Sequence, residues 1–148
     1  MKVGIKKITA DAKIPEYKHK NDAGMDVCNC GDDISLKPGE RALVPTGIKI
    51  AVPPGYEMQV RPRSGMAINK GITVLNTPGT IDSQYRGEVK VIVFNAGNEA
   101  VVLKKHERIA QIVLNKFEEI EWEETEELDS TERGEGGFGS TGEIEERR

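Results

Sequence analysis

The stretch IKIAVPPGYEMQV at residues 48–60 decides the fold class of this chain. In its first half Ile48, Ile50 and Val52 alternate with a lysine and an alanine, and in its second half Met58 and Val60 alternate with polar residues. Every second side chain of a strand points to the same face, so this period of two is typical of strands in a sheet with two different faces. The PPG sequence between the two runs marks a turn.

The rest of the chain repeats this organisation. Alternation at residues 89–94 predicts another strand, and residues 101–114 carry more β-branched side chains than a helix favours. The 16 glycines and 7 prolines are spread throughout and separate the short runs. We expect one short helix, opening at Ser64 in SGMAINK, where the serine can cap the first turn. Many short strands with Gly/Pro turns predict an all-β sandwich, jelly roll or barrel.

Composition limits the possible functions. The 148 residues fit one domain, and their net charge of −4 gives no basic field for a polynucleotide, so we expect no stable nucleic-acid binding. We interpret Cys28 and Cys30 as reduced bystanders, because no second Cys or His pair completes a metal site. The N-terminus lacks the apolar run of a signal peptide, and no segment is long enough to span a membrane. We therefore expect a cytoplasmic protein.

The composition changes near the C-terminus. Residues 118–128 are heavily acidic, but Ile120, Trp122 and Leu128 keep one apolar face that allows an edge strand. Large apolar side chains are scarce after residue 128, which is typical of a flexible segment. We expect a β domain at residues 1–128 and a flexible, glycine-rich arm at residues 129–148.

Three turn-like segments carry charged or hydroxyl side chains. DAGMD at residues 22–26 is compatible with an ordinary turn. RPRSG at residues 61–65 places a cation and a hydroxyl at a helix start, which suits either an anion site or simple capping. LNTPGTIDSQYRGE at residues 75–88 predicts a β-hairpin around its Pro-Gly pair. Its Asp82 can orient or deprotonate a water, and its Tyr85 can pack on a sugar, although a decorated surface hairpin is the alternative.

The arm contains RGEGGFGSTG at residues 133–142. Glycines let backbone N–H groups converge on a phosphate, Arg133 can clamp phosphate oxygens, and Phe138 can stack on a base. No lysine follows the glycines, so the segment is not a P-loop. On composition alone, a disordered end is the alternative.

Taken together and in order, these segments resemble the homotrimeric deoxyuridine triphosphatase (dUTPase) family. The five matching motifs are AGMDV at residues 23–27, PRSGMA at 62–67, GTID at 79–82 continuing to YRGE at 85–88, RIAQI at 108–112, and RG at 133–134 followed by GGFGSTG at 136–142. One motif alone is weak evidence, but five in order are highly specific. Val27 stands where the family more often has leucine. This departure changes no residue to which the family gives a chemical role.

The resemblance implies a distorted jelly-roll subunit that forms a homotrimer with three shared active sites. The third motif of one subunit, the first, second and fourth of another, and the arm of the remaining one would build each site. The implied reaction is hydrolysis of dUTP to dUMP and pyrophosphate by attack of water on the α-phosphorus. That reaction limits uracil in DNA and provides dUMP for dTMP synthesis.

The resemblance also implies individual roles. Asp82 would be the base, and Mg²⁺ would lie near Asp26, through a metal-bound water rather than directly. The arm would close as a lid. The residues expected around the phosphates are Arg63, Ser64, Gln111, Arg133, Gly139, Ser140 and Thr141. Those expected around uracil and deoxyribose are Asn76, Gly79, Thr80, Ile81, Tyr85 and Phe138.

Two alternatives remain open at this point. A dCTP deaminase resembles the family in fold and assembly, and it would release ammonia from dCTP. A non-catalytic nucleotide sensor or regulatory protein could also use the same fold. The hydrolase is favoured because the Pro-Arg-Ser-Gly segment, Asp82 and the Gly-Phe-Gly-Ser segment of the arm are all present.

Overall fold

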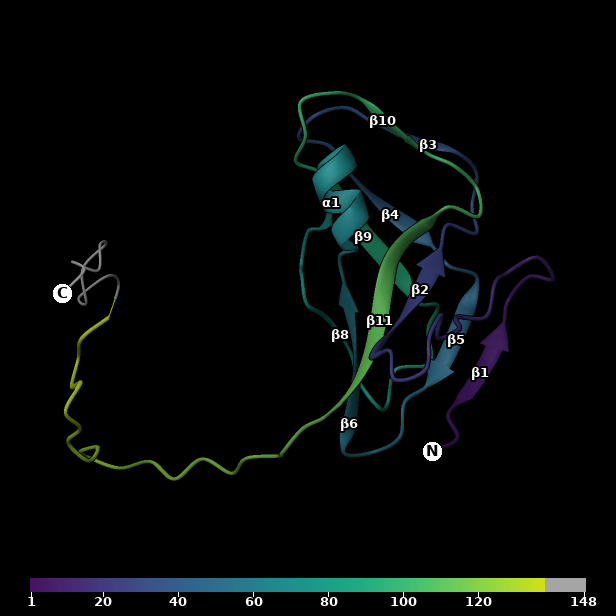
Figure 1. Cartoon of the computed structure of the whole chain (residues 1–148). Helices are drawn as coiled ribbons and strands as arrows, with labels where there is room; N and C mark the ends of the chain where they lie inside the picture. Colours follow the sequence, from purple (N-terminus) through teal and green to yellow (C-terminus); the bar gives the residue numbers. More distant parts are fainter. Residues whose placement is uncertain (138–148) are drawn as a thin grey trace.

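The computed structural model describes residues 1–137, and among these nearly all regular structure is β (Figure 1). This confirms the all-β prediction. The strands are β1 (Gly4–Lys7), β2 (Gly24–Cys28), β3 (Ile34–Leu36), β4 (Arg41–Pro45), β5 (Ile48–Ala51), β6 (Tyr56–Arg61), β7 (Ile72–Val74), β8 (Gly79–Ile81), β9 (Lys90–Asn95), β10 (Val101–Leu103) and β11 (Arg108–Lys116), and helix α1 spans Ser64–Lys70.

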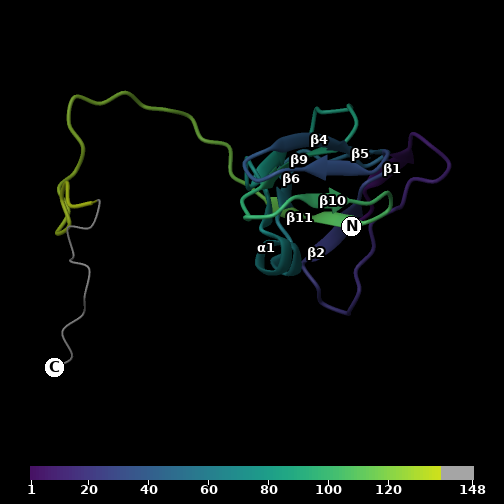
Figure 2. The same ribbon diagram turned by 90° about the horizontal axis from the view of Figure 1, so that it is seen from above.

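Two antiparallel sheets form the layers of the fold (Figure 2). The larger sheet has the order β2–β11–β6–β8, and the smaller one has the order β4–β9–β7. Two strand pairs, β1–β5 and β3–β10, complete the structure. Alternate residues of each layer are fully buried, for example Val91 and Val93 of β9 and Ile112 of β11, so the core lies between the layers.

The stretch at residues 48–60 forms two strands as predicted, but they do not pair with each other. β5 pairs with β1, whereas β6 lies between β11 and β8. The Pro-Pro-Gly turn therefore connects two different sheets. Because β6 is flanked on both sides, its register positions residues from the second, third and fourth motifs.

The predicted hairpin at residues 75–88 is wrong in its local form. β7 and β9 do pair, with Val74 opposite Val93, but the chain between them leaves the sheet and adds β8 to the other layer. There Gly79 lies opposite Val60 and Ile81 lies opposite Met58. Gly79 and Ile81 are buried against β6, and for this reason the chain forms β8 in the larger sheet instead of a tight turn between β7 and β9.

The edge strand that the apolar face of residues 118–128 allows is absent from the described chain. β11 ends at Lys116, and residues 117–137 carry no strand. This segment leaves the body of the subunit, so no neighbouring strand of the same chain accepts its backbone hydrogen bonds (Figure 1). Among the residues described, no helix is long and apolar enough to cross a membrane.

Candidate active site

A hollow of about 280 Å³ lies between β8 and the smaller sheet. Period-two alternation along β8 buries Gly79 and Ile81 and leaves Thr80 exposed. The Asn76 side chain packs closely against Gly79, since a Cβ at this position would lie 3.2 Å from the Asn76 amide nitrogen. Six predicted residues line the hollow together, namely Asn76, Gly79, Thr80, Ile81, Asp82 and Tyr85.

The loop after β8 folds back and holds Tyr85 at this hollow. The Tyr85 hydroxyl donates a hydrogen bond to the Glu88 carbonyl (2.9 Å), and its backbone N–H donates to the Asp82 carbonyl (3.1 Å). The ring lies against Gly87, where any Cβ would overlap it. The Arg86 guanidinium is used inside the loop, because it donates to the Tyr85 carbonyl at 2.8 Å.

Asp82 lies at the end of β8 with an exposed side chain. Within residues 1–137 its carboxylate accepts no hydrogen bond. An acceptor in this position is free to take a proton or a hydrogen bond from a water bound in the hollow.

The first, second and fourth motifs meet at Asp26. Its Oδ1 accepts from Arg63 Nε at 2.8 Å, and its Oδ2 accepts from Arg108 Nη1 at 3.1 Å. Arg63 Nη1 also donates to the Arg108 carbonyl (3.1 Å). The Asp26 and Arg63 side chains are only 19% and 24% exposed, so their ion pair is less screened than a surface pair. One carboxylate thus holds two guanidinium groups.

Ser64 has a different local role from the one predicted. Arg63 is the N-cap of α1, Ser64 is the first helical residue, and no side chain caps the helix. Arg63 occupies the cap position with extended backbone, while its side chain is held by Asp26. The Ser64 side chain is exposed and remains available to a ligand. The capping interpretation of Ser64 is therefore wrong.

Ser64 borders a second hollow of about 550 Å³ on the outer face of the larger sheet. Gln111 also lines it, and its Nε2 donates to the Pro62 carbonyl at 2.8 Å. Gly24 leaves room for this amide, because a Cβ there would overlap the Gln111 side-chain oxygen. The second hollow thus collects Arg63, Ser64 and Gln111, three of the predicted phosphate contacts.

The two hollows lie on opposite faces of the larger sheet. Val60 of β6 lines the first, whereas its neighbours Gln59 and Arg61 line the second. Successive side chains of a strand point to opposite faces, so one chain cannot bring both hollows onto one small ligand.

The arm stays apart from both hollows in the described chain. Arg133 lies in the extended segment, where its Nε donates to the Gly136 carbonyl at 2.8 Å (Figure 1). The other arm predictions, namely Phe138, Gly139, Ser140 and Thr141, lie outside the described residues.

Sequence reasoning missed three residues of this arrangement. Arg108 was recognised only as part of a motif, but it holds Asp26. Gly87 and Glu88 shape the position of Tyr85. The arginine could not be paired with its carboxylate from the sequence, since 82 positions separate them.

Cys28 lies beside Asp26 but shows no sign of reactivity. Burial, followed by the nearby Asp26 charge, raises the pKa of the Cys28 thiol. A raised pKa keeps the group in its poorly nucleophilic thiol form. Both cysteines are free in the structure, in agreement with their interpretation as reduced.

The sequence profile of the dUTPase family matches residues 10–142, so this chain belongs to the dUTPase family. A deoxyuridine 5'-triphosphate nucleotidohydrolase of Fusobacterium nucleatum is 61% identical over 143 residues, which cover 95% of this chain and 98% of that protein. Another, from Nautilia profundicola, is 56% identical over 142 residues, covering 96% and 99%.

Solved structures agree with the fold. The dUTPase of Staphylococcus bacteriophage 80alpha, solved with dUPNHPP, superposes with a TM-score of 0.88 at 28% identity, covering 95% of this chain and 98% of that one. The prediction of a dUTPase-like jelly roll is confirmed.

Proposed function

We propose that this chain hydrolyses dUTP to dUMP and pyrophosphate by attack of water on the α-phosphorus. The observation that carries the proposal is the first hollow, in which the short edge strand β8 and the loop after it present Gly79, Asp82 and Tyr85 together. A base-reading backbone, a candidate general base and a sugar contact are thereby gathered in one place. Membership of the dUTPase family and the names of its relatives support the same reaction.

The position of β8 supports recognition of uracil by backbone groups. β8 is the last strand of its sheet and pairs only with β6, so one row of its N–H and C=O groups has no strand partner within the described chain. Uracil offers an N3–H donor beside its O4 acceptor, whereas cytosine has an unprotonated N3 beside a 4-amino donor. Backbone groups of Gly79, Thr80 and Ile81 would bind uracil, and buried groups left unpaired would reject cytosine.

Asp82 is the proposed base in this scheme. It would accept a hydrogen bond from the attacking water and take its proton as the oxygen bonds to phosphorus. Tyr85 would lie under the deoxyribose, where a 2′-hydroxyl would clash with its ring. Asn76 and Gln111 would help to hold water or nucleotide.

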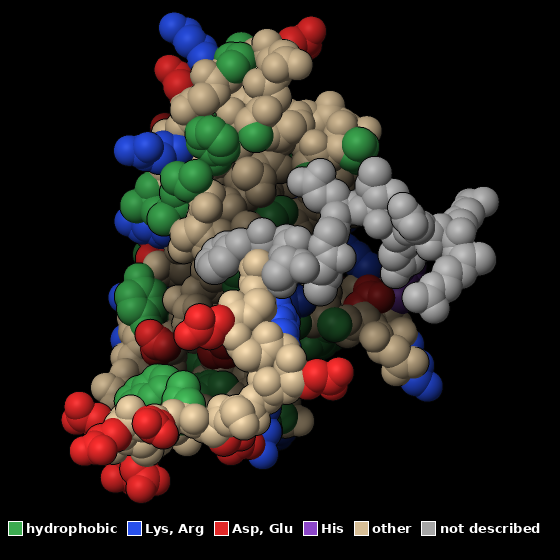
Figure 3. Space-filling model, turned by 90° about the vertical axis from the view of Figure 1, so that its left-hand side faces the viewer, with side chains coloured by type: hydrophobic (Ala, Val, Ile, Leu, Met, Phe, Trp, Pro, Cys, Tyr) green, Lys and Arg blue, Asp and Glu red, His purple; other side chains and the backbone are tan. Residues whose placement is uncertain are grey.

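The triphosphate would be bound by Arg63, Ser64 and Gln111 of another copy of the chain. The two hollows on opposite faces support an assembly of several copies, proposed here as a homotrimer, because each hollow needs a partner surface to complete a nucleotide site. Figure 3 shows hydrophobic side chains at the surface of one face. Large apolar residues exposed in the single chain include Leu43 (58%) and Ile68 (82%), which suits burial in an assembly.

The residues around Asp26 fit a Mg²⁺ ion that is held through water. Within residues 1–137 no group of three or more His, Cys, Asp and Glu side chains could hold a metal. Both Asp26 oxygens already accept from guanidinium groups, so direct ligation would displace an arginine. Mg²⁺ commonly keeps several waters and uses phosphates with one or two carboxylates. When bound, it neutralises charge on the phosphate oxygens.

The arm at residues 129–148 would complete the site from a third copy. Arg133, Gly139, Ser140 and Thr141 would bind the β- and γ-phosphates, and Phe138 would stack over uracil. The described part of the arm makes few contacts with its own subunit, which leaves Arg133 free to reach a neighbour. A catalytic domain at residues 1–128 and a cytoplasmic location stay predictions from the sequence.

The test is pyrophosphate release in the presence of Mg²⁺ from dUTP, dCTP, dTTP and UTP, measured side by side. Release from dUTP alone is expected. Release of ammonia from dCTP would instead identify a deaminase, and no reaction with any nucleotide would contradict the proposed hydrolysis.

A further inference from the structure

Tyr85 depends on an exposed loop for its position. The loop at residues 82–88 leaves β8 and returns to β9, and Tyr85 is 46% exposed. Its hydroxyl is held only by the Glu88 carbonyl among the described residues. Together with the contact of the ring with Gly87, the placement of this carbonyl fixes where the ring lies.

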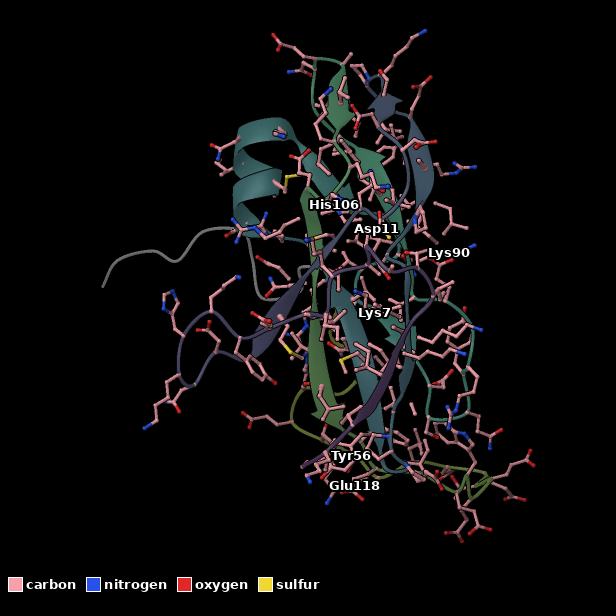
Figure 4. All side chains as sticks on the ribbon, turned by 90° about the vertical axis from the view of Figure 1, so that its right-hand side faces the viewer. Lys7, Asp11, Tyr56, Lys90, His106 and Glu118 are labelled. Carbon is pink, nitrogen blue, oxygen red and sulfur yellow. The ribbon has the colours of Figure 1, made fainter. Side chains whose placement is uncertain are left out.

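Glu88 ties this loop to the body of the protein. Its Oε1 accepts a hydrogen bond from the Gly47 backbone N–H at 2.9 Å, and its Oε2 lies 3.6 Å from Lys90 Nζ. The Glu88 side chain is 21% exposed, whereas the Lys90 side chain is 43% exposed. Lys90 begins β9 and is labelled in Figure 4. The buried partner of the carboxylate is thus the Gly47 N–H.

The turn that contains Gly47 is a rigid anchor. Gly47 is buried with a φ of 71°, and a side chain there would overlap Cys30 and Ala12. Its carbonyl accepts from the Ile8 N–H at 2.7 Å. Next to Gly47, the Val89 N–H donates a hydrogen bond to the Ile48 carbonyl at 2.9 Å. This bond holds the strand that follows Glu88.

We propose that Glu88 is a positioning residue that fixes Tyr85 through the Gly47 turn and so sets the preference for deoxyribose over ribose. The inference rests on the proposed function, since it needs Tyr85 to lie under the sugar. Glu88 borders the first hollow, and it acts on Tyr85 through its carbonyl. Its carboxylate is required as a hydrogen-bond acceptor of the right reach, and its charge is secondary.

Two conservative substitutions separate reach from charge. Glu88→Asp keeps the charge but shortens the side chain by one methylene, so it no longer reaches the Gly47 N–H. Glu88→Gln keeps both the reach and an acceptor oxygen. Glu40→Ala is a matched control, because Glu40 Oε2 accepts from the Lys37 backbone N–H at 2.7 Å in a distant turn.

The experiment measures kcat and KM for pyrophosphate release from dUTP and from UTP in the full-length protein and these variants. In Glu88→Asp the dUTP/UTP ratio of kcat/KM should fall by up to about tenfold, as expected for loss of one hydrogen bond. In Glu88→Gln and Glu40→Ala it should stay within about twofold of the unsubstituted value. Thermal unfolding of each variant checks that it is folded.

An unchanged ratio in folded Glu88→Asp would overturn the inference, and so would an equal fall in Glu88→Gln. Loss of stability without a change in ratio would show that Glu88 is merely structural. Failure of the proposed function is distinguishable, because the unsubstituted chain would then release no pyrophosphate from dUTP or would not prefer dUTP to UTP.

Discussion

Replacing Gly24 by alanine places a methyl group where the side-chain oxygen of Gln111 lies. The backbone of β2 accepts alanine, because Gly24 is not among the glycines with positive φ. The amide of Gln111 must therefore rotate away, and its 2.8 Å hydrogen bond to the Pro62 carbonyl is lost. We expect the second hollow to lose a correctly oriented Gln111 in this variant.

Two free-energy terms of opposite sign act on the stability of Gly24→Ala, whereas only the loss of the Gln111 hydrogen bond acts on its activity. Loss of the hydrogen bond costs about 1 kcal/mol. Exchange of glycine for alanine in a compatible conformation stabilises by about 0.4–1 kcal/mol. Net stability should change by less than about 1 kcal/mol, or less than about 4 °C in Tm for a chain of this size. The 1 kcal/mol lost in orienting Gln111 corresponds to about a fivefold fall in kcat/KM.

A double-mutant cycle tests this reasoning with dUTP as the substrate. Gly24→Ala, Gln111→Ala and the double variant should all show similar kcat/KM, because each removes the same amide from the site. Gly4→Ala is the control, since a Cβ there meets only Ala51 Cβ at an ordinary 3.5 Å. Losses that multiply in the double variant would refute the idea that Gly24 acts through Gln111.

Asp82→Asn should keep dUTP binding, measured by calorimetry, and lose about 10²–10⁴-fold in turnover; substantial activity would remove Asp82 as the base. Truncation before Arg133 should leave the oligomer intact in light scattering and cut activity by orders of magnitude, whereas full activity would show that the arm is dispensable. The Asp11 pKa of about 2, lowered first by the hydrogen bond from Lys105, should return toward 3.8 in Lys105→Met when followed by NMR. Because this folded pKa is depressed, the associated stability is present above pH 3.8 and is lost as the pH falls toward 2; an unchanged pKa in the variant would contradict the pairing.

The fold was largely predictable where local patterns carried the signal. Alternation along residues 48–60 gave β5 and β6, and the glycine after Lys70 ends α1 in the left-handed conformation, with its N–H on the Ala67 and Met66 carbonyls. The failures concern pairing between distant segments. β8 was hidden inside a predicted hairpin because its partner is β6, and the expected strand at residues 118–128 has no partner in the same chain.

The candidate site shows the same division. Sequence motifs identified the residue types that line each hollow, because a glycine-rich turn, a carboxylate and arginines in fixed order carry a recognisable chemistry. They could not show that Asp26 holds Arg63 and Arg108 together, or that Glu88 reaches the turn at Gly47. Such contacts depend on the register between strands and not on residues that are neighbours in the sequence.

The sequence by itself determined several strand-forming segments and the resemblance to the family, and it predicted which residues perform the chemistry, since periodicity and motif spacing are local properties. Only the tertiary structure decided which of these residues share a surface. β11 between β2 and β6 aligns Gln111 with Asp26 and Arg61, while alternation along β6 puts the first hollow on the opposite face of the sheet. The physical reason is that a shift of one residue in register would turn every side chain of a strand to the other face.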